Sequence, residues 1–566
     1  MRGPCITAEN SFVTGITAGT ASSMVAMAAS DERALESLLR VDAYPHPADR
    51  VQRHTTHISQ VFLAGDFAYK LKRPVALGFV DFSTLPRRRF YCEEELRLNR
   101  RLAPDLYLGV VAVTRSGERV RIDGDGEIVD YAVKMRRFHQ RDLLSMQALT
   151  GSLIDGLAER IAGFHSGLKP APPDSPYGEP HAVLAPMLDN FGPVRAALAS
   201  AGQAGKRQLR RLAHLERWTR KHFEQLRSCL DDRRRVGCIR ECHGDMHRGN
   251  IVVIAGEPVI FDCIEFNPGL RWIDTMSEVA FLTMDLAEAG EHAQARRLLN
   301  RYLEVTGDYS GLRLLRFYQV YRALVRAKVS AIGISQALGN KPETAASRAE
   351  LDHYLDLALA CSARHRPQLF ITYGLSGSGK TWLGQLLREY LPIIQLRSDI
   401  ERKRLFGVPE QSRPQAHQGA QIYSAEATGR TYRRLLELSR ELIAAGFSVL
   451  VDATFLAREQ RAPFIALADE MRCSCRILAL QAPMHILRER ISSRIREGTD
   501  ASDADIDVLG LQIARREPLS DAEHRHALFL DTERPLQVES LLERIVGARG
   551  SCRSHYSAGI SQIKSH

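Results

Sequence analysis

His243-Gly-Asp-Met-His-Arg-Gly-Asn250 is the stretch that decides the fold of the first half of the chain. Asp245 is followed five positions later by Asn250, and a second aspartate, Asp262, comes after a short apolar hairpin. In kinase chemistry one carboxylate orients the attacking hydroxyl and accepts its proton, while an asparagine and another aspartate hold Mg²⁺. The spacing therefore predicts Asp245 as the catalytic base. Asn250 and Asp262 are the expected ligands of Mg²⁺ on ATP.

The residues before this stretch have the pattern of a small β-rich lobe. Two short apolar runs, 61–63 and 67–71, flank Ala64-Gly65-Asp66, and this order predicts a strand hairpin. Residues 90–102 are predicted to form an amphipathic helix, because leucines are spaced among Glu and Arg. Three more strands are expected after it, at 106–113, 119–122 and 128–135. This order is the layout of a small kinase lobe.

A kinase site also needs a lysine and a glutamate from this lobe. The lysine lies on a strand and binds the nucleotide phosphates, and the glutamate holds it from the helix. Lys70 on the second hairpin strand and Glu95 on the predicted helix fit these roles. Lys72 points to the same side of the strand as Lys70 and is an alternative. Glu93 and Glu94 are lesser alternatives on the helix.

The chain on either side of the catalytic stretch is predicted to be mainly helical. Helical periodicity runs from 143 to about 235 and again from 272 to about 360. His243 and His247 have the i,i+4 spacing of a metal pair, but that spacing forms one face only on a helix. Here both belong to a loop, so a zinc site is rejected. Taken singly, each candidate residue could be an ordinary turn or strand end, but five parts in the right order favour a kinase.

Gly374-Leu-Ser-Gly-Ser-Gly-Lys-Thr381 is the second decisive stretch and matches the P-loop pattern G-x-x-x-x-G-K-[ST]. It follows a compact apolar strand at 368–373 and precedes a helical run, which is the context that the pattern requires. Lys380 is expected to reach the β- and γ-phosphates, and Thr381 to supply an oxygen to Mg²⁺. The loop residues expected to hold phosphate oxygens are Gly374, Ser376, Gly377, Ser378 and Gly379.

Alternating helices and apolar strands follow the P-loop and predict a parallel α/β sheet. Asp452 ends the strand at 447–452, where it could support Mg²⁺. Arg490 and Arg494 lie four positions apart on a predicted helix and therefore share one face. They suit a lid that closes on ATP, and a basic stripe on the surface is the alternative.

Length, composition and charge are those of a multidomain globular protein. The chain has 566 residues, and this length is too great for one ordinary core. Its residues are 44% hydrophobic and 25% charged, as in soluble globular proteins. A net charge of +10 suits an anionic ligand such as a nucleotide, but no long basic tract indicates nucleic-acid binding. Ten scattered cysteines favour a reducing cytoplasm. The sequence contains no run of about 18 apolar residues, so a membrane span is not expected. The oligomeric state is left open.

The first half resembles the aminoglycoside phosphotransferase family of the protein-kinase-like fold. The resemblance lies in the 243–250 stretch, in Ile260-Phe-Asp-Cys-Ile-Glu-Phe266 and in Ile161-Ala-Gly-Phe-His165, and it covers roughly residues 35–350. It implies ATP-dependent phosphorylation of a small-molecule hydroxyl by Asp245. No G-x-G-x-x-G loop is present; His57-Ile-Ser-Gln60 occupies the equivalent turn. The resemblance names a reaction and does not identify an antibiotic as the substrate.

The second half resembles small P-loop kinases such as gluconate kinase, phage polynucleotide kinase and zeta toxin. The resemblance rests on Leu396-Arg-Ser-Asp-Ile-Glu-Arg-Lys403 at the end of the next predicted strand. It implies that Asp399 positions the acceptor hydroxyl as a base and that Arg402 grips phosphate; a solvated charged helix start is the alternative for Arg402. The whole order is similar to a bacterial two-domain family of bifunctional phosphotransferase and AAA-type ATP-binding proteins.

The expected fold is an α+β protein-kinase-like bilobal domain followed by an α/β P-loop NTPase domain with a parallel sheet. Three functions are considered: two kinase sites acting on small molecules, one active kinase with a nucleotide-sensing P-loop domain, and a nucleic-acid-associated P-loop ATPase. The first is preferred. The expected boundaries are a flexible leader at 1–33, the kinase domain at 34–360, a linker at 361–367, the P-loop domain at 368–548 and a loose tail at 549–566.

Overall fold

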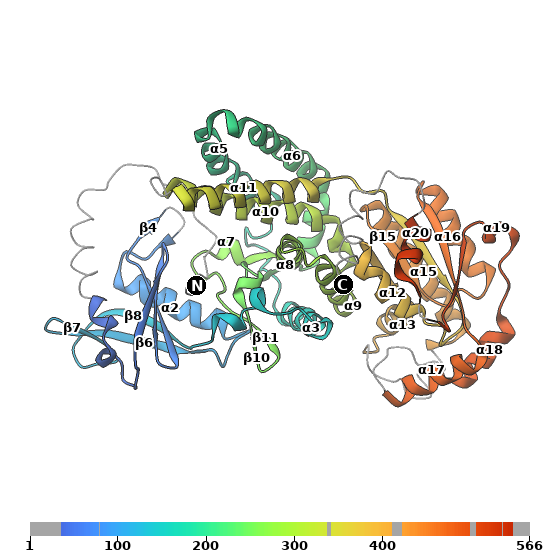
Figure 1. Cartoon of the computed structure of the whole chain (residues 1–566), viewed down its shortest axis with the longest axis horizontal. Coiled ribbons are helices and arrows are strands. Elements are labelled where there is room, and N and C mark those ends of the chain that lie inside the picture. Colours follow the sequence, from blue (N-terminus) through green and yellow to red (C-terminus); the bar gives the residue numbers. More distant parts are fainter. Residues whose placement is uncertain are drawn as a thin grey trace. The chain divides into compact units, whose positions relative to one another are not determined.

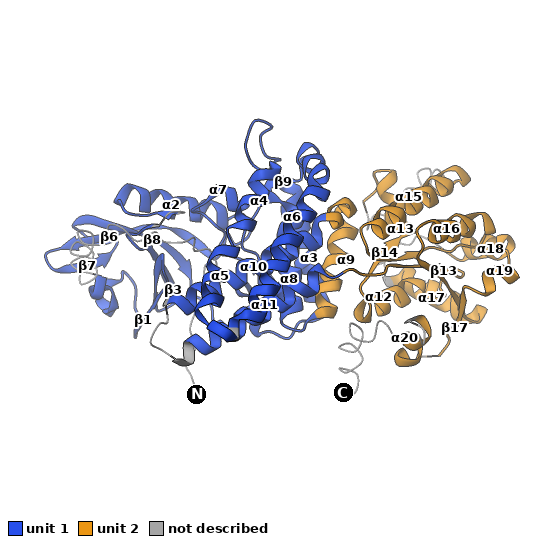
Figure 2. Ribbon diagram, turned by 90° about the horizontal axis from the view of Figure 1, so that it is seen from above, with its two compact units in different colours: residues 1–291, 314–363 blue, residues 292–313, 364–566 orange. Residues whose placement is uncertain are grey.

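The computed structural model describes residues 35–77, 80–336, 341–409, 422–497, 505–534 and 536–546. The chain forms two compact units (Figure 2), the first made of residues 1–291 and 314–363 and the second of residues 292–313 and 364–566. The predicted leader and tail lie outside the described residues. Within those residues, no helix combines the length and the apolar character that crossing a membrane would require.

The first unit begins with a six-stranded antiparallel sheet (Figure 1). Its order is β1 (Val51–Thr55), β2 (Ser59–Ala64), β3 (Phe67–Lys72), β8 (Glu127–Arg136), β6 (Tyr107–Ser116) and β7 (Arg119–Ile122). The predicted hairpin is confirmed, because β2 and β3 pair around Gly65. Gly65 has a φ of +55°, and a Cβ there would lie 2.7 Å from the Pro47 carbonyl oxygen. A residue with a side chain would therefore disturb this turn.

Helix α2 (Leu85–Asn99) packs against β6 and β8 of this sheet. The helix was predicted at 90–102, so it begins five residues earlier and ends three residues earlier than expected. Pro86 lies in its first turn, where the fixed φ of proline favours a helix start and no N–H partner is lost. The leucine spacing that predicted the helix does not mark this first turn.

The rest of the first unit is mainly helical. A core of buried apolar side chains, including Phe191, Leu215, Phe281, Leu324 and Leu355, joins five of its helices. Two short antiparallel pairs lie next to the 243–250 stretch in sequence: the hairpin of β10 (Ile251–Ile254) with β11 (Glu257–Ile260), and β9 (Ile239–Glu241) with the more distant β12 (Trp272–Asp274). The helices are α3 (Gly151–Gly167), α4 (Pro180–Leu188), α5 (Phe191–Ser200), α6 (Lys206–Arg235), α7 (Pro268–Arg271), α8 (Thr275–Glu288), α10 (Leu312–Gln336) and α11 (Lys341–Ser362).

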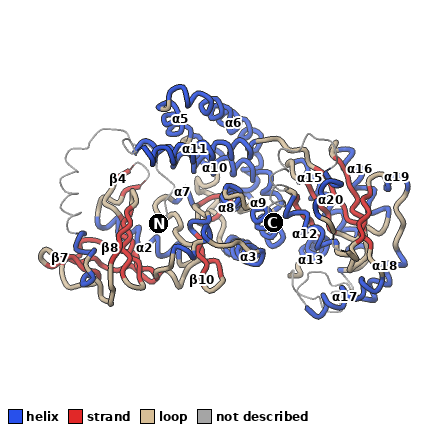
Figure 3. The backbone as a smooth tube through the Cα atoms, in the orientation of Figure 1, coloured by secondary structure: helices blue, strands red, loops and turns tan. Residues whose placement is uncertain are grey.

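The second unit contains a five-stranded parallel sheet with helices packed against it (Figure 3). The strand order is β14 (Ile393–Arg397), β15 (Ser448–Asp452), β13 (Gln368–Tyr373), β16 (Ser474–Gln481) and β17 (Ala527–Asp531). Its helices include α12 (Lys380–Tyr390), α13 (Ser398–Leu405), α15 (Ala425–Ala444), α16 (Arg458–Glu470), α17 (Met484–Glu497), α18 (Ile506–Arg515), α19 (Asp521–His524) and α20 (Val538–Val546). The predicted fold class is confirmed for both halves.

The division into units differs from the predicted boundaries at one segment. Residues 292–313, which contain α9 (His292–Thr306), were expected in the first domain but belong to the second unit. Helix α9 packs on α12 and β14, and Leu298, Tyr302 and Leu303 are buried. An amphipathic pattern shows that a helix buries one face but not which core receives it. The other boundary, after Ala363, falls inside the predicted linker.

Candidate functional site

The first unit joins a lysine of β3, a glutamate of α2 and the aspartate after β11. Lys70 Nζ lies 2.8 Å from Glu95 Oε1 and 2.5 Å from Asp262 Oδ1. Lys72 donates to the other oxygen of Glu95 and to Glu265. All five side chains are buried. The structure thus brings together three residues that the sequence predicted to share one site: Lys70, Glu95 and Asp262.

The alternatives left open by the sequence are separated by these contacts. Lys70 reaches Asp262 and lines an adjoining cavity, whereas Lys72 is held by Glu265 and does not line it. These contacts favour Lys70 over Lys72, and its binding of phosphate stays a prediction. Glu93 pairs with Arg89 on the surface, and Glu94 pairs with Arg97 and Arg271.

Strong electrostatic interactions hold this buried network in its charged form. Burial opposes ionisation of Glu95, but the Lys70 and Lys72 ammonium groups overcome it and hold the pKa of Glu95 at about 2. Burial likewise opposes the charge on Lys70, but Asp262 and Glu95 raise its pKa well above the ordinary value. Burial raises the pKa of Glu265, although Lys72 lowers it. A fixed lysine beside Asp262 can stabilise negative charge on a phosphate.

Asp245 and Asn250 meet in the loop before β10. Asn250 Nδ2 donates to the Asp245 backbone oxygen at 3.0 Å and to Asp245 Oδ2 at 3.1 Å. Burial works against the Asp245 charge, but His247, 3.5 Å away, outweighs it and lowers the Asp245 pKa. Both residues are buried, and within the described part of the chain neither Asp245 Oδ1 nor Asn250 Oδ1 has a hydrogen-bond partner. Such oxygens fit a hydroxyl donor and a hard cation.

The loop that carries Asp245 is held by Glu278 and Arg322, which the sequence did not single out. Gly244 has a φ of +88°, and its N–H donates to Glu278 Oε1 at 2.6 Å. The other oxygen of Glu278 lies 2.9 Å from His165 Nε2. Arg322 donates to the Gly244 carbonyl oxygen at 2.9 Å. These contacts fix the backbone from which Asp245 projects. No local pattern marks Glu278 or Arg322, because each acts across a long separation in sequence.

An apolar cavity of about 60 Å³ adjoins Lys70 and Asp262. Polar side chains also line it, among them His54, Ser59 and Arg137. Tyr107 also lines it, and its hydroxyl accepts the Asp262 N–H at 3.2 Å. The apolar residues that line the cavity are Val61, Leu63, Ala68, Met135, Phe138 and Phe261.

The P-loop of the second unit connects β13 to α12. Gly377 and Gly379 have φ values of +81° and +86°, a conformation that favours glycine. Lys380 Nζ donates to the carbonyl oxygens of Gly374 at 3.1 Å and Leu375 at 2.8 Å, so its chain lies along the loop. The α12 N-terminus and the loop N–H groups make an anion site.

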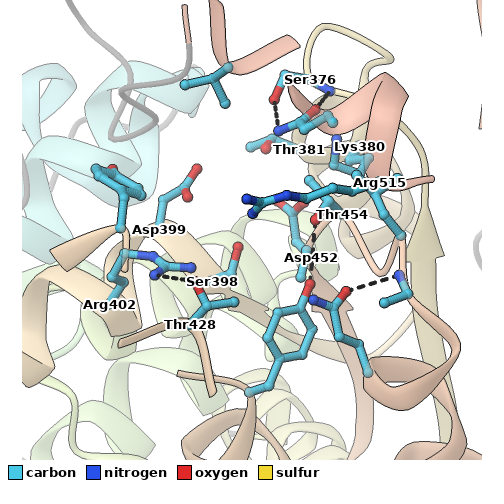
Figure 4. Close-up of a pocket in the computed structure, with 18 of the residues that line it drawn as sticks. Ser376, Lys380, Thr381, Ser398, Asp399, Arg402, Thr428, Asp452, Thr454 and Arg515 are labelled. Atoms are coloured by element: carbon cyan, nitrogen blue, oxygen red, sulfur yellow. Dashed lines mark hydrogen bonds between the residues drawn. The ribbon is translucent and has the colours of Figure 1, made fainter. Parts of the chain in front are cut away.

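The P-loop opens into a cavity of about 1010 Å³ (Figure 4). Lys380, Thr381 and Asp452 line one part of it, and Asp399 and Arg402 of α13 lie opposite them. Burial raises the pKa of Asp452, although the charges of Arg397 and Lys380 lower it. Most of the sequence-predicted residues thus line one cavity, whereas Gly374 and Ser378 are not among its lining residues.

Arg402 is fixed at the wall of this cavity. It donates to the Ile422 carbonyl oxygen at 2.8 Å and to Thr428 Oγ1 at 3.2 Å, and its guanidinium lies over the Tyr423 ring. Only 7% of the residue is exposed, so the alternative of a solvated helix start does not hold for Arg402. A guanidinium held at the wall of a cavity suits an anionic group.

The α17 arginines line the same cavity, as their shared face predicts. Arg490 donates to the carbonyl oxygens of Thr532 at 2.6 Å and Gly377 at 3.4 Å, and so it braces the P-loop. The surface-stripe alternative does not fit this placement, and a lid motion of Arg490 and Arg494 stays a prediction.

Helix α18 contributes residues that sequence reasoning missed. Gln512 accepts the Ser376 N–H at 2.8 Å and donates to Ser376 Oγ at 2.9 Å, and Arg515 reaches into the cavity (Figure 4). Their spacing of three, together with Val508, marks one helix face and could have pointed to them.

Comparisons with known proteins give one family match in each half of the chain, and the first match includes residues 292–313 of the second unit. Residues 84–315 match the family described as "Phosphotransferase enzyme family", and residues 369–519 match "AAA domain". An uncharacterized protein of Mycobacterium tuberculosis strain H37Rv and one of Mycobacterium bovis are each 30% identical over 487 residues, covering 85% of this chain and 92% of the relative.

Solved structures are similar to either half of the chain. An amicoumacin kinase is 13% identical over 60% of this chain and 94% of its own, with a TM-score of 0.36. A sugar kinase from Janibacter sp. is 21% identical over 32% and 92%, with a TM-score of 0.24. A gluconokinase from Sinorhizobium meliloti is 19% identical over 32% and 98%, with a TM-score of 0.23. On its mycobacterial relatives and its two domain matches, the chain belongs to a family in which a phosphotransferase-family domain precedes a P-loop AAA domain, and both domains support phosphotransferase activity.

Proposed function

We propose that this chain transfers the γ-phosphate of ATP to a hydroxyl of a small molecule at Asp245, and that the P-loop cavity is a second ATP site of the kinase type. The observation that carries the first part is a pair of buried oxygens, Asp245 Oδ1 and Asn250 Oδ1, that find no hydrogen-bond partner among the residues the structure describes, beside the Lys70–Asp262 contact. A buried acceptor without a donor is costly unless a ligand supplies one.

At the first site each side chain has a separate task. Asp245 orients the acceptor hydroxyl and takes its proton, since its lowered pKa keeps it ionised. Lys70 binds the nucleotide phosphates and is itself held by Glu95. Asn250 and Asp262 are the oxygen ligands for Mg²⁺, which supplies neutralisation of the phosphate charge when bound.

At the second site Lys380 and the loop N–H groups bind phosphate, and Thr381 and Asp452 face the metal position. Asp399 orients an acceptor hydroxyl, and Arg402 binds phosphate charge. A phosphate loop and an acid on opposite walls of one cavity support transfer between two bound molecules rather than nucleotide binding alone. The protein would then be a bifunctional kinase.

The partners proposed are small-molecule hydroxyl acceptors, without nucleic acid or a membrane. The location proposed is the cytoplasm. Among the cysteines that the structure describes, none forms a disulfide, which supports a reducing compartment.

The proposal is tested by incubating the full chain with ATP, Mg²⁺ and a cell metabolite extract, followed by mass spectrometry of phosphorylated products. The wild type is expected to add phosphate to at least one extract component. The double variant Asp245→Asn, Lys380→Ala should form none of these products, because it lacks the base of one site and the phosphate lysine of the other. An unchanged product set in the double variant would refute the proposed function.

A further inference from the structure

Helix α9 covers the edge of the parallel sheet with a specific contact. Strand β14 is an edge strand, whose outer N–H and C=O groups lack a neighbouring strand. The buried side chain of Asn300 replaces that neighbour, because Nδ2 donates to the Ile393 carbonyl oxygen at 3.1 Å and Oδ1 accepts the Gln395 N–H at 2.8 Å. Asn300 therefore fixes the backbone of β14 on both sides of residue 394.

The side chain of Gln395 continues this connection into the P-loop site. Gln395 Nε2 donates to Asp452 Oδ2 at 3.1 Å, and both side chains are buried. Gln395 Oε1 is buried without a hydrogen-bond partner among the described residues. An apolar side chain here would avoid the cost of that unmet acceptor. The amide is thus explained better by what it does to Asp452 than by packing.

Room for the Gln395 amide is made by a glycine inside helix α12. A Cβ added to Gly384 would lie 2.3 Å from Gln395 Nε2 and 2.6 Å from its Cδ. Glycine in a helix interior lowers stability relative to alanine. Gly384 therefore makes α12 less stable than alanine would, but it leaves space for the Gln395 side chain that contacts Asp452.

We propose that Gln395 is a positioning residue for Asp452 and that α9 fixes it through Asn300. Gln395 holds one carboxylate oxygen of Asp452, so that the group presents a constant orientation to a divalent cation on the nucleotide. This inference rests on the metal role proposed for Asp452. It makes the P-loop site depend on a helix that precedes the P-loop domain in sequence and lies inside the segment that matches the phosphotransferase family.

The test measures how Mg²⁺ strengthens ATP binding at the P-loop of the full chain. Trp382 lines the cavity and is 49% exposed, so its fluorescence reports nucleotide at this site, with Trp382→Phe as the blank. ATP affinity is compared in Mg²⁺ and in EDTA. Gln395→Leu is expected to lower the Mg²⁺ affinity of the ATP complex about tenfold, as loss of a residue that orients a ligand does. The affinity in EDTA should stay unchanged.

Two further variants, at residues of α12 and α9 that contact Gln395, test the same role. Gly384→Ala displaces the Gln395 side chain without changing its chemistry, and it serves if Gln395→Leu does not fold. Asn300→Leu removes the contacts to β14. Both variants should lower the Mg²⁺ affinity of the ATP complex, as Gln395→Leu does. Arg296→Ala is the matched control on α9, because the Arg296 side chain donates to the carbonyl oxygens of Arg388 and Glu389 at the end of α12 and not to β14.

Each outcome decides one part of the inference. If Asp452→Asn lowers Mg²⁺ affinity but Gln395→Leu and Gly384→Ala do not, Gln395 is not a positioning residue, and the proposed function stands. If Asp452→Asn has no effect, the proposed metal role itself is wrong. If Arg296→Ala lowers Mg²⁺ affinity as much as Asn300→Leu, general packing of α9 is responsible and the specific role of Asn300 is overturned.

Discussion

Asp245→Asn is expected to lower the turnover of the first site by about a thousandfold, as loss of a general base does. Asparagine has nearly the same shape and can still accept the Asn250 hydrogen bond, but it cannot take a proton from the acceptor hydroxyl. The KM for ATP should change by less than about twofold, because the residues proposed to bind its phosphates and metal are unchanged. Turnover is measured in the Lys380→Ala background, so that the P-loop site does not contribute.

The matched control for this variant is Asp105→Asn, the same chemical change at an exposed residue of the first unit. It should leave turnover and KM unchanged. A raised KM for ATP with unchanged turnover in Asp245→Asn would contradict the assignment, since it would place Asp245 at the nucleotide instead of at the acceptor.

Lys72→Met is expected to lower the free energy of unfolding of the first unit by about 3 kcal/mol or more, because it leaves the buried Glu265 carboxylate without its lysine and Glu95 with Lys70 alone. Lys72 is 2% exposed and donates to both Glu95 and Glu265. The double variant Lys72→Met, Glu265→Gln should recover part of the loss, since it removes the carboxylate left unpaired. Lys221→Met, at an exposed lysine of α6, should be neutral.

The pH dependence of this loss has a defined sign. In the folded wild type the pKa of Glu95 is about 2, below its ordinary value of 4.5. Its ionised form therefore stabilises the fold above pH 4.5, and this contribution is lost as the pH falls toward 2. The deficit of Lys72→Met should be full at pH 7 and should shrink below pH 4.5.

Denaturant unfolding is followed by the fluorescence of Trp218 and Trp272, both in the first unit, in a Trp382→Phe background. A deficit that is constant with pH, or a double variant no more stable than the single one, would show that Lys72 acts through packing alone.

The parts of the sites set by local spacing could be predicted from the sequence directly, and Lys70, Glu95 and Asp262 from the order of their elements. Asp245 and Asn250 lie in one loop, and the P-loop carries its own strand and helix context, so a few consecutive residues determine each geometry. The choice between Lys70 and Lys72 could not be made this way. Alternate residues of a strand share one face, and only their partners in space distinguish them.

The residues that the sequence missed act through contacts far apart in the chain. Glu278 holds the Gly244 N–H from α8, and Asn300 holds β14 from α9. Each looks in sequence like an ordinary polar residue of an amphipathic helix. Helix α9 packs on α12 and β14 of the second unit. The apolar periodicity of α9 predicts that one face is buried but does not predict which core buries it.

We propose that the chain carries two separate phosphoryl-transfer sites. This is tested by comparing the phosphorylated products that the full-length single variants Asp245→Asn and Lys380→Ala form from ATP, Mg²⁺ and a metabolite extract. We predict that each variant loses a different part of the wild-type product set and retains the rest. If either variant retained every wild-type product, its site would not transfer phosphate, and the two-site account would be contradicted.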